Sequence, residues 1–424
     1  MAHCAATQPT DPASGVQPPI AARNSRLRGK RAAMVTFSPY PGDPRPRRAV
    51  DALVGEGMSV DLVCLGSGNA PRRERLNGIE VFRVGLENCR GGKLAYAYQY
   101  AAFILISSAI FALRSLSRRY DLVYVHNMPD ILVLSSLLPK ALGAKVILDM
   151  HDPMPELMTT IFHASPGSKS VQLLKRLEKW SIARADSVIT VNIACKRIFS
   201  TRSCRSEKIA VVMNSPDSQI FPFRMSREHD FTGEPRNKCF VIMYHGSLVE
   251  RNGLEVAIDA LERVRKTVPT IELHIFGSKT HFLERMMRKV RDNNLQDLVR
   301  YFGPKRLEDL VTAIDSCDIG VIPNHRNVFT EINTPTRIFE YLALGKPVIA
   351  PSTPGILDYF SEESLLFFEP GSPDDLAQKI EYAYSHPSKV LDIARKGQQV
   401  YLEHTWSQER ETLVNQVSGL LNGD

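Results

Sequence analysis

The feature that most constrains the fold of this chain is an alternation of short apolar runs with helical stretches, and it occurs twice. From residue 32 the runs AAMVTF, MSVDLVCL, IEVFRV, DLVYVH, AKVILDM and SVITV have the length of buried strands. After a polar stretch near residues 215–238 the alternation restarts with CFVIMYHGS and continues through IELHIFG, LVRYFG, IGVIP, KPVIA and SLLFF. Such alternation is typical of parallel sheets covered by helices on both faces. The sequence therefore predicts an α/β fold of two Rossmann-like, doubly wound domains.

We expect an N-terminal domain over residues 32–215 and a C-terminal domain over residues 216–400. Ligands of open parallel sheets bind beyond the carboxyl ends of the strands, so two such domains facing each other would place a site in the cleft between them. Residues 1–31 are rich in Ala, Pro and Arg and lack the apolar core of a signal peptide, which predicts a disordered tail. Residues 401–424 contain a last helical stretch that we expect to pack back toward the N-terminal domain.

Charge is distributed unevenly along the chain. Residues 1–230 carry 31 Lys and Arg against 19 Asp and Glu, whereas residues 231–424 carry 22 against 27. A basic half indicates an anionic partner, which can be a substrate, a membrane surface or nucleic acid. The arginines lack the interleaved aromatic residues of a nucleic-acid-binding surface, so we expect no nucleic-acid partner. The seven scattered cysteines show no zinc-like spacing and indicate a reduced, cytoplasmic protein.

The segment Leu94–Leu113 is long and apolar enough to cross a bilayer, with twenty residues and no charge. It also contains Gln99, two serines and three tyrosines, and strand-like runs lie on both sides of it. A parallel sheet needs a crossover helix at this point, so we expect a helix of the fold rather than a membrane span. Arginines flank the segment, and its outward face could rest on an anionic membrane.

The most informative motif is NTPTRIFEYLALGKPVIA, at residues 333–350. Pro335 is placed where it can begin a helix, and Arg337 and Glu340, three residues apart, share one face of that helix. A helix N-terminus and an arginine attract phosphate, and a carboxylate accepts hydrogen bonds from a vicinal diol such as ribose. Taken alone, the pair is equally compatible with an ordinary surface Arg–Glu pair.

A second motif, YHGSLVERNGLE, places Gly246 and Ser247 at a strand end and Arg251 just before a helix. Backbone N–H groups and a cation at one helix N-terminus make a phosphate cradle that needs no Walker lysine. Gly277 in IFGS and Gly303 in YFGP also follow strands. The three strand ends, taken with the first motif, predict a nucleotide pocket in the second domain.

These motifs carry a resemblance to a known family. The run from Tyr244 to Pro370 resembles the donor half of the family 4 retaining glycosyltransferases, two-domain enzymes of the GT-B fold that transfer a sugar from a nucleotide-sugar. The first half resembles the acceptor domain of that family through the Pro41–Arg45 loop and the runs YVHNMPD and LDMHDPMPE. The resemblance covers about residues 32–420 and implies a hexosyltransferase activity.

The resemblance also implies roles for particular residues. His151 matches the family histidine beside the transferred sugar, and Glu340 matches the second glutamate of the E-x7-E motif, which binds the ribose. The expected donor-binding residues are Gly246, Ser247, Arg251, Gly277, Thr334, Arg337 and Glu340. The expected catalytic residues are His151 and Glu331. The expected acceptor-side residues are Gly42, Arg45, His126, Asp130, Asp152 and Glu156.

Two positions depart from the family pattern. The first glutamate of E-x7-E would fall on Ile332, so either a local shift brings Glu331 into place or backbone groups at Asn333–Thr334 recognise the sugar. The usual early arginine falls on Ser247, which leaves Arg251 and Arg337 to neutralise the diphosphate.

The chain has no D-x-D motif, so we expect no metal and no other cofactor. The expected acceptor is a glycan or a lipid-linked precursor of a cell-envelope polysaccharide, and the enzyme would work in the cytoplasm or peripherally on the inner face of the plasma membrane. Arg45, Arg47, Arg48, Arg72, Arg73 and Arg75 could meet lipid headgroups or substrate phosphates there. Two alternatives stay open: a nucleotide-sugar epimerase of the same fold, and a catalytically silent nucleotide-sugar-binding module.

Overall fold

The computed structural model describes residues 25–66, 68, 70–76, 78–86, 93–226 and 239–423, and of residues 93–97 only the backbone. The first domain has an eight-stranded sheet in the order β3-β4-β2-β1-β5-β6-β7-β8, parallel throughout except for the pair β3·β4. Its strands are β1 (Arg31–Pro39), β2 (Ser59–Leu65), β3 (Arg73–Leu76), β4 (Ile79–Val84), β5 (Leu122–His126), β6 (Lys145–Met150), β7 (Ser187–Thr190) and β8 (Ile209–Val211).

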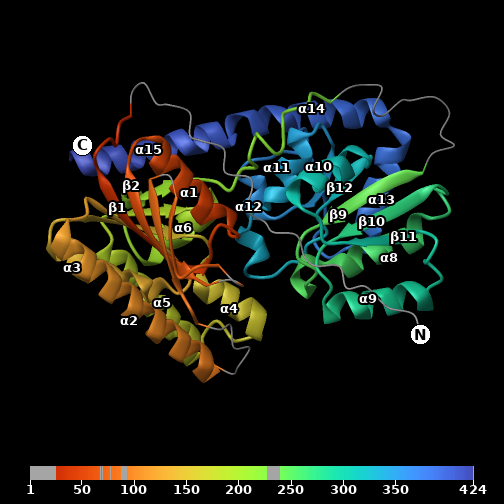
Figure 1. Ribbon diagram of the computed structural model, residues 1–424. Helices are drawn as coiled ribbons and strands as arrows, with labels where there is room; N and C mark the ends of the chain where they lie inside the picture. Colours follow the sequence, from red (N-terminus) through yellow and green to blue (C-terminus); the bar gives the residue numbers. More distant parts are fainter. Residues whose placement is uncertain are drawn as a thin grey trace, which may run out of the picture.

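Helices cover both faces of this sheet, because successive side chains of a strand point to opposite sides. Ala33 and Val35 of β1 share an apolar cluster with residues of α2 and α5, whereas Ala32 and Met34 share one with residues of α1 and α15. Figure 1 shows these two sets of helices on opposite sides of the sheet. The helices are α1 (Pro44–Gly55), α2 (Lys93–Ser117), η1 (Asp130–Ser136), α3 (Leu137–Ala141), α4 (Met154–Phe162), α5 (Lys169–Arg184), α6 (Ile193–Arg202) and η2 (Ser206–Lys208), with α15 (Trp406–Asn422) added from the C-terminus.

The second domain has a six-stranded parallel sheet in the order β11-β10-β9-β12-β13-β14. Its strands are β9 (Phe240–His245), β10 (Ile271–Phe276), β11 (Val299–Gly303), β12 (Ile319–Val321), β13 (Val348–Pro351) and β14 (Leu366–Phe368). Its helices are η3 (Glu250–Asn252), α8 (Leu254–Val264), α9 (His281–Asp292), α10 (Leu307–Asp315), η4 (Thr330–Ile332), α11 (Thr336–Ala343), α12 (Pro354–Leu357), α13 (Pro373–Ser385) and α14 (Pro387–Glu403). The prediction of two doubly wound parallel α/β domains is confirmed.

The chain returns to the first domain at its C-terminal end. In Figure 1, α14 and α15 follow one another along the upper side of both domains. Leu413, Val414 and Val417 of α15 are at most 2% exposed and belong to the same apolar cluster as Leu53 of α1. The C-terminal helix therefore completes the core of the N-terminal domain.

The disordered tail expected over residues 1–31 extends too far, because its last residues are part of the folded first domain. Residues 1–24 lie outside the described residues, but Ser25 to Lys30 are ordered against the first domain. Leu27 is 2% exposed, and the Arg26 guanidinium donates to the Glu411 carboxylate of α15 over 2.7 Å. The short N-terminal segment is held because it supplies one apolar side chain and one ion-pair partner to the packing of α15.

The apolar segment near residue 100 is part of α2, a helix of the first domain. By length and composition, residues Tyr98–Ser117 could cross a membrane, with a mean hydropathy of 1.6. Phe103 and Phe111 are fully buried against the sheet, in the same cluster as Val35. Only 28% of the apolar stretch is buried, so most of this helix faces away from the core.

If α15 completes the core of the first domain, Leu413→Ala will lower the stability of that domain by about 2–4 kcal/mol, since it leaves a cavity among buried side chains. Thermal unfolding followed by circular dichroism measures the effect. Thr412→Ala, on the exposed face of the same helix, is the matched control and should leave the melting temperature nearly unchanged. Equal melting temperatures for the two variants would show that α15 adds nothing to this core.

Candidate active site

The donor-side residues gather at the carboxyl ends of β9 and β12, where the strand order of the second sheet reverses. Arg337, in the first turn of α11, donates from Nη1 to the carbonyl oxygen of His245 over 2.8 Å and lies 4.8 Å from the centroid of the Tyr244 ring. Arg251 lies over the Phe329 ring at 5.8 Å. Within the described ranges no carboxylate forms an ion pair with either arginine, so the two positive charges are available to an anion.

The Glu340 carboxylate lies one helical turn after Arg337, and its Oε2 is 3.4 Å from Nε2 of His245. Burial raises the pKa of Glu340 to about 7, although Arg337 and Arg48 oppose the shift. Burial and the nearby Arg337 lower the pKa of His245 to about 3, so this imidazole is neutral. Glu340 can therefore change its protonation state near neutral pH, beside a neutral histidine.

Close backbone approach shapes the strand ends of this sheet. Gly253 has a φ of +66° and caps α8, and a Cβ atom there would lie 1.9 Å from the carbonyl oxygen of Pro323 after β12. A Cβ atom on Gly277 would lie 2.3 Å from the carbonyl oxygen of Gly246. The carbonyl oxygen of Ser247 accepts hydrogen bonds from the side chains of Tyr244 and Asn252 and from the backbone N–H of Val249, and these bonds close the turn after β9.

The segment around η4 joins the two domains. The Asn192 side chain of the first domain donates to the carbonyl oxygen of Ile332 over 2.8 Å and to Thr334 Oγ1 over 3.2 Å. Ile332, at the position of the missing family glutamate, packs against the core of the first domain. Glu331 Oε1 lies 3.3 Å from the Arg326 guanidinium. The departure from E-x7-E therefore coincides with a contact between the domains.

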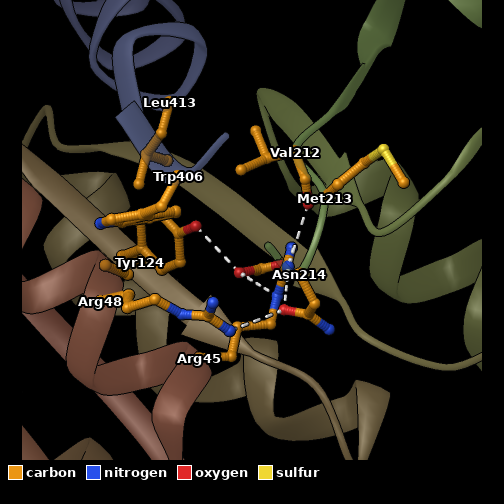
Figure 2. Close-up of a pocket in the computed structure, with 10 residues that line it drawn as sticks. Arg45, Arg48, Tyr124, Val212, Met213, Asn214, Trp406 and Leu413 are labelled. Carbon is orange, nitrogen blue, oxygen red and sulfur yellow. Dashed lines mark hydrogen bonds and ion pairs between the residues drawn. The ribbon is translucent and has the colours of Figure 1, made fainter. Parts of the chain in front are cut away.

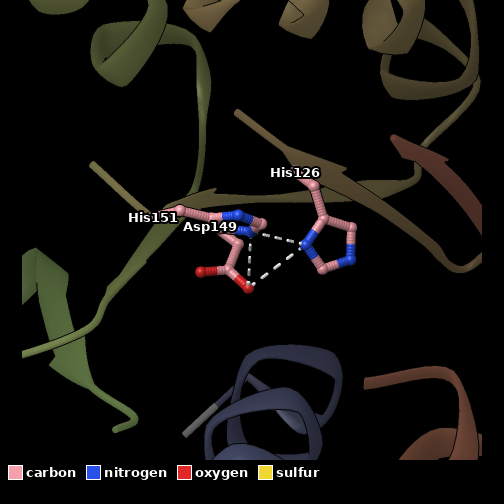
Figure 3. Close-up of side chains that lie close together, drawn as sticks. All are labelled: His126, Asp149 and His151. Carbon is pink, nitrogen blue, oxygen red and sulfur yellow. Dashed lines mark hydrogen bonds and ion pairs between the residues drawn. The ribbon is translucent and has the colours of Figure 1, made fainter. Parts of the chain in front are cut away.

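The first domain contributes a buried polar network at the carboxyl ends of β5 and β6. Asp149 is 1% exposed and accepts from Arg45 Nε over 3.1 Å and from the Tyr124 hydroxyl over 2.9 Å (Figure 2). Its Oδ2 lies 3.4 Å from His126 Nδ1, which lies 2.9 Å from His151 Nε2 (Figure 3). Although burial alone would raise it, the Arg45 guanidinium and the two imidazoles hold the pKa of Asp149 well below its usual range.

This network fixes the state of His151. Burial lowers the pKa of His151 well below its usual range, so the imidazole is neutral. His126 Nδ1 lies 2.9 Å from His151 Nε2 and 3.4 Å from the ionised Asp149, so a proton on His126 Nδ1 would donate to His151 Nε2 and lie beside the carboxylate. His151 Nε2 then accepts, and its own proton sits on Nδ1. The carboxylate thus orients the histidine through a second imidazole.

The same three side chains satisfy the distances of a metal site, since their ligand atoms all lie within 4.8 Å of one another. Their partners argue against a cation, because the Arg45 guanidinium already contacts both oxygens of Asp149. A divalent ion there would lie beside a buried positive charge.

The cavity beside Arg45 and Arg48, about 10 Å³, has room for about one water molecule (Figure 2).

Several residues that were expected on the acceptor side are internal to the first domain. Arg45 and Arg48, at 8% and 9% exposure, are buried rather than free for headgroups, because Arg45 pairs with Asp149 and Arg48 donates to the carbonyl oxygen of Ser215. Glu156 forms a partly buried ion pair with Arg202 at 2.6 Å.

Asp130 and His126 are also internal. Asp130 is 5% exposed and accepts a hydrogen bond from Asn127 over 3.0 Å, so it shapes the turn after β5. Burial raises its pKa to about 7. His126 is fully buried and contacts His151, with His126 Nδ1 lying 2.9 Å from His151 Nε2.

Two acceptor-side residues remain near the surface at strand ends. Gly42 is exposed in the turn between β1 and α1. Asp152 follows His151 and is half-buried; burial raises its pKa, and Arg251 of the other domain opposes the shift. The effect of Arg251 on the pKa of Asp152 indicates that the donor side and the acceptor side of the candidate site lie close to each other.

Sequence reasoning missed Asp149, Tyr124, His245 and Asn192. For Asp149 a signal existed, because a carboxylate inside an apolar strand, two residues before His151, points to the same side of the sheet. The contact of His245 with Glu340 had no local signal, since these residues are far apart in the sequence.

The close approach at Gly253 makes a strong prediction. Gly253→Ala will destabilise the second domain by about 2–4 kcal/mol, because the new methyl group overlaps the Pro323 carbonyl and φ is positive. Thermal unfolding measures the change. Gly419→Ala, a helical glycine of α15 with open space around it, is the control and should stabilise by about 0.5–1 kcal/mol. A melting temperature of Gly253→Ala equal to that of the wild type would contradict the geometry.

Comparison with known families gives one match in each domain. Residues 42–215 match the glycosyl transferase 4-like domain, and residues 225–400 match glycosyl transferases group 1. Among curated proteins, the probable glycosyltransferase WbjE of Pseudomonas aeruginosa is 23% identical over 245 residues, 56% of this chain and 59% of that protein. The amylovoran biosynthesis glycosyltransferase AmsK of Erwinia amylovora is 23% identical over 46% of this chain and 47% of that protein. The chain thus spans less than two thirds of the length of these relatives.

Solved structures share the fold. Sucrose-phosphate synthase from Thermosynechococcus elongatus superposes with a TM-score of 0.73 at 16% identity, over 93% of this chain and 100% of that one. Anabaena Alr3699/HepE in complex with UDP-glucose superposes with a TM-score of 0.68 at 17% identity, over 92% and 99%. With both halves of the two-domain pattern matched in order, this chain belongs to the family 4 glycosyltransferases of the GT-B fold.

Proposed function

We propose that this protein is a retaining glycosyltransferase that moves a sugar from a nucleotide-sugar to a lipid-linked or polysaccharide-precursor acceptor, without a metal ion. One observation carries the proposal. Arg251 and Arg337 are half-buried at the strand ends of the second sheet, have no carboxylate partner among the described residues, and lie in the same site as Glu340. Two uncompensated cations fit a diphosphate, and a nearby carboxylate fits ribose hydroxyls.

The donor would bind with its diphosphate between the two arginines and the turn Gly246–Ser247. Its ribose would donate hydrogen bonds to Glu340. UDP-sugars are the first candidates, because Anabaena Alr3699/HepE, of the same fold, has been solved in complex with UDP-glucose. The sugar itself would lie toward His151 and Asp152 of the first domain.

The chemistry follows from charge. A retaining transfer passes through a sugar with oxocarbenium-like positive charge and a departing diphosphate with growing negative charge. Arg251 and Arg337 are in place before the reaction and stabilise the negative charge of the leaving group, as the donors of an oxyanion hole do. The neutral His151 can hydrogen-bond the sugar without repelling its positive charge, and the Asp149–His126 pair holds its orientation.

The acceptor and location are also proposals. AmsK is named for amylovoran biosynthesis, which supports a polysaccharide precursor as acceptor. The excess of Lys and Arg in residues 1–230 supports work at an anionic surface, which we take to be the cytoplasmic face of the plasma membrane.

A catalytically silent nucleotide-sugar-binding module is the second candidate. It is favoured because Ile332, at the position of the missing family glutamate, takes part in the contact between the domains. It would bind the donor without turnover. An epimerase would instead interconvert donor sugars without any acceptor.

The decisive experiment measures release of nucleoside diphosphate from UDP-, GDP- and ADP-sugars, with and without EDTA and with a glycan acceptor. If the protein is a metal-independent transferase, release of nucleoside diphosphate will depend on the acceptor, and EDTA will not abolish it. Arg337→Ala should weaken donor binding about tenfold to a hundredfold, since it removes a charge-assisted contact. Arg306→Ala, an exposed arginine of the same domain, is the control. Binding without release would establish the silent module, and release abolished by EDTA would refute metal-independent departure.

The raised pKa of Glu340 predicts how donor affinity depends on pH. The carboxylate form accepts the ribose hydrogen bonds and is present above its pKa of about 7, so affinity for UDP-glucose should fall as the pH drops, by about tenfold for each unit below that value. Calorimetric titration at several pH values measures this. Glu340→Gln, which cannot ionise, should bind weakly and with a flat profile. An unchanged slope in the Gln variant would assign the titration to another group.

A further inference from the structure

A second basic site lies at the opposite end of the first sheet from the candidate active site. An open cavity of about 370 Å³ is lined by the first residues of β1, β2 and β4 and by the last turn of α2. Four arginines line it, Arg31, Arg75, Arg114 and Arg118, against the two carboxylates Asp61 and Glu80. Its position at the amino ends of the strands separates it from the donor and acceptor residues.

The two carboxylates of the cavity are already neutralised. Asp61 accepts from Arg31 and from Arg114, the latter over 2.9 Å. Glu80 accepts from Arg114 over 2.5 Å and from Arg73 of β3. The Arg75 guanidinium, 82% exposed in its side chain, reaches Glu80 only at 3.6 Å.

Arg118 donates to the carbonyl oxygen of Gly29 at 3.4 Å and pairs with no carboxylate in the described ranges. The cavity therefore keeps an excess of positive charge at its mouth, carried by Arg75 and Arg118. An excess of this kind attracts an anionic group such as a phosphate.

An exposed apolar stripe leads to this cavity. Tyr98, Leu105, Leu113 and Leu116 of α2 are each at least 70% exposed, while Phe103 and Phe111 on the opposite side of the helix are fully buried. Leu113 and Leu116 belong to the last turns of α2, as Arg114 does, and Arg118 directly follows the end of the helix. Apolar side chains beside a basic cavity match a lipid, whose acyl chains and phosphate lie next to each other.

The direction of α2 connects the two sites. The parallel strands β4 and β5 precede and follow α2, so the helix begins near the carboxyl ends of the strands and ends near their amino ends (Figure 1). With 25 residues it is roughly 37 Å long. If α2 lay flat on a bilayer, its N-terminal end would hold the acceptor side of the candidate active site near the lipid headgroups.

We propose that the cavity formed by Arg31, Arg75, Arg114 and Arg118 binds the phosphate headgroup of an anionic membrane lipid, and that the exposed stripe of α2 inserts between the acyl chains beside it. The inference deepens the membrane part of the proposed function and rests on it, but it does not depend on which sugar is transferred. Charge complementarity selects an anionic lipid, and the leucines select a lipid rather than a soluble phosphate.

Flotation of the full chain with vesicles tests the inference. Vesicles of phosphatidylcholine with one third phosphatidylglycerol should bind the wild type, and pure phosphatidylcholine vesicles should bind it at least tenfold more weakly. The double variant Arg75→Ala/Arg118→Ala should lose about tenfold or more of the binding to anionic vesicles, along with most of its salt dependence. Leu113→Gln/Leu116→Gln should lose a similar factor at every salt concentration.

The matched control is Arg306→Ala/Leu307→Gln, an exposed arginine and leucine at the start of α10 in the other domain. It should bind anionic vesicles as the wild type does. If the control loses as much vesicle binding as the cavity variants, general surface charge rather than the proposed site accounts for the binding, and the proposal is overturned. Calorimetric binding of glycerol phosphate as tight as that of short-chain phosphatidylglycerol would also overturn the lipid assignment in favour of a soluble phosphate.

Release of nucleoside diphosphate from UDP-glucose, measured on the same variants without vesicles, separates this inference from the transferase proposal. The variants should release it at the wild-type rate, because none of these residues lies at the candidate active site. Turnover by a wild type that does not bind anionic vesicles would refute the membrane site and leave the transferase standing. Vesicle binding by a wild type that releases nucleoside diphosphate from none of the UDP-, GDP- and ADP-sugars with an acceptor would refute the transferase and leave the membrane site standing.

Discussion

The buried ion pair between Arg45 and Asp149 is the interaction on which the candidate active site depends most. Arg45 comes from the first turn of α1 and Asp149 from the middle of the sheet, and both are less than a tenth exposed. Arg45 also donates to the carbonyl oxygen of Val212 and to Asn214, each over 3.0 Å. One guanidinium thus ties a helix, a strand and the segment that leaves the first domain. Removing either partner would leave a charge buried without compensation, which is far more costly than an exposed ion pair.

That ion pair also sets the chemistry nearby. An ionised Asp149 orients His126, which orients His151, and the buried Arg45 helps to keep His151 neutral. On the acceptor side, the charges of Arg45 and Asp149 therefore neutralise each other inside the domain. On the donor side the reverse holds, because Arg251 and Arg337 are left without carboxylate partners in the described chain. The site combines a neutral histidine on one domain with available cations on the other, the arrangement that the proposed transfer from a diphosphate donor would use.

Arginines of the first domain divide into two kinds that composition does not distinguish. Arg45 and Arg48 are buried and internal to the fold. Arg75 and Arg118 are exposed at the far end of the sheet, beside the apolar stripe of α2. Of these four arginines, the exposed ones lie at the amino ends of the strands rather than at the start of α1, because Arg45 pairs with the buried Asp149.

The sequence by itself determined the two doubly wound domains, because strand-length apolar runs separated by helices leave few other ways to bury both faces of a sheet. It also identified Arg337 and Glu340 as a pair, since three residues along a helix fix a shared face. Only the tertiary structure decided that Arg45 pairs with Asp149, that His245 meets Glu340, and that Ile332 seals a contact between domains. Those partners lie far apart in the chain, and neither periodicity nor spacing encodes which buried charge meets which. Whether an arginine is available to a ligand depends on that pairing, and so it was settled by the packing of the folded chain.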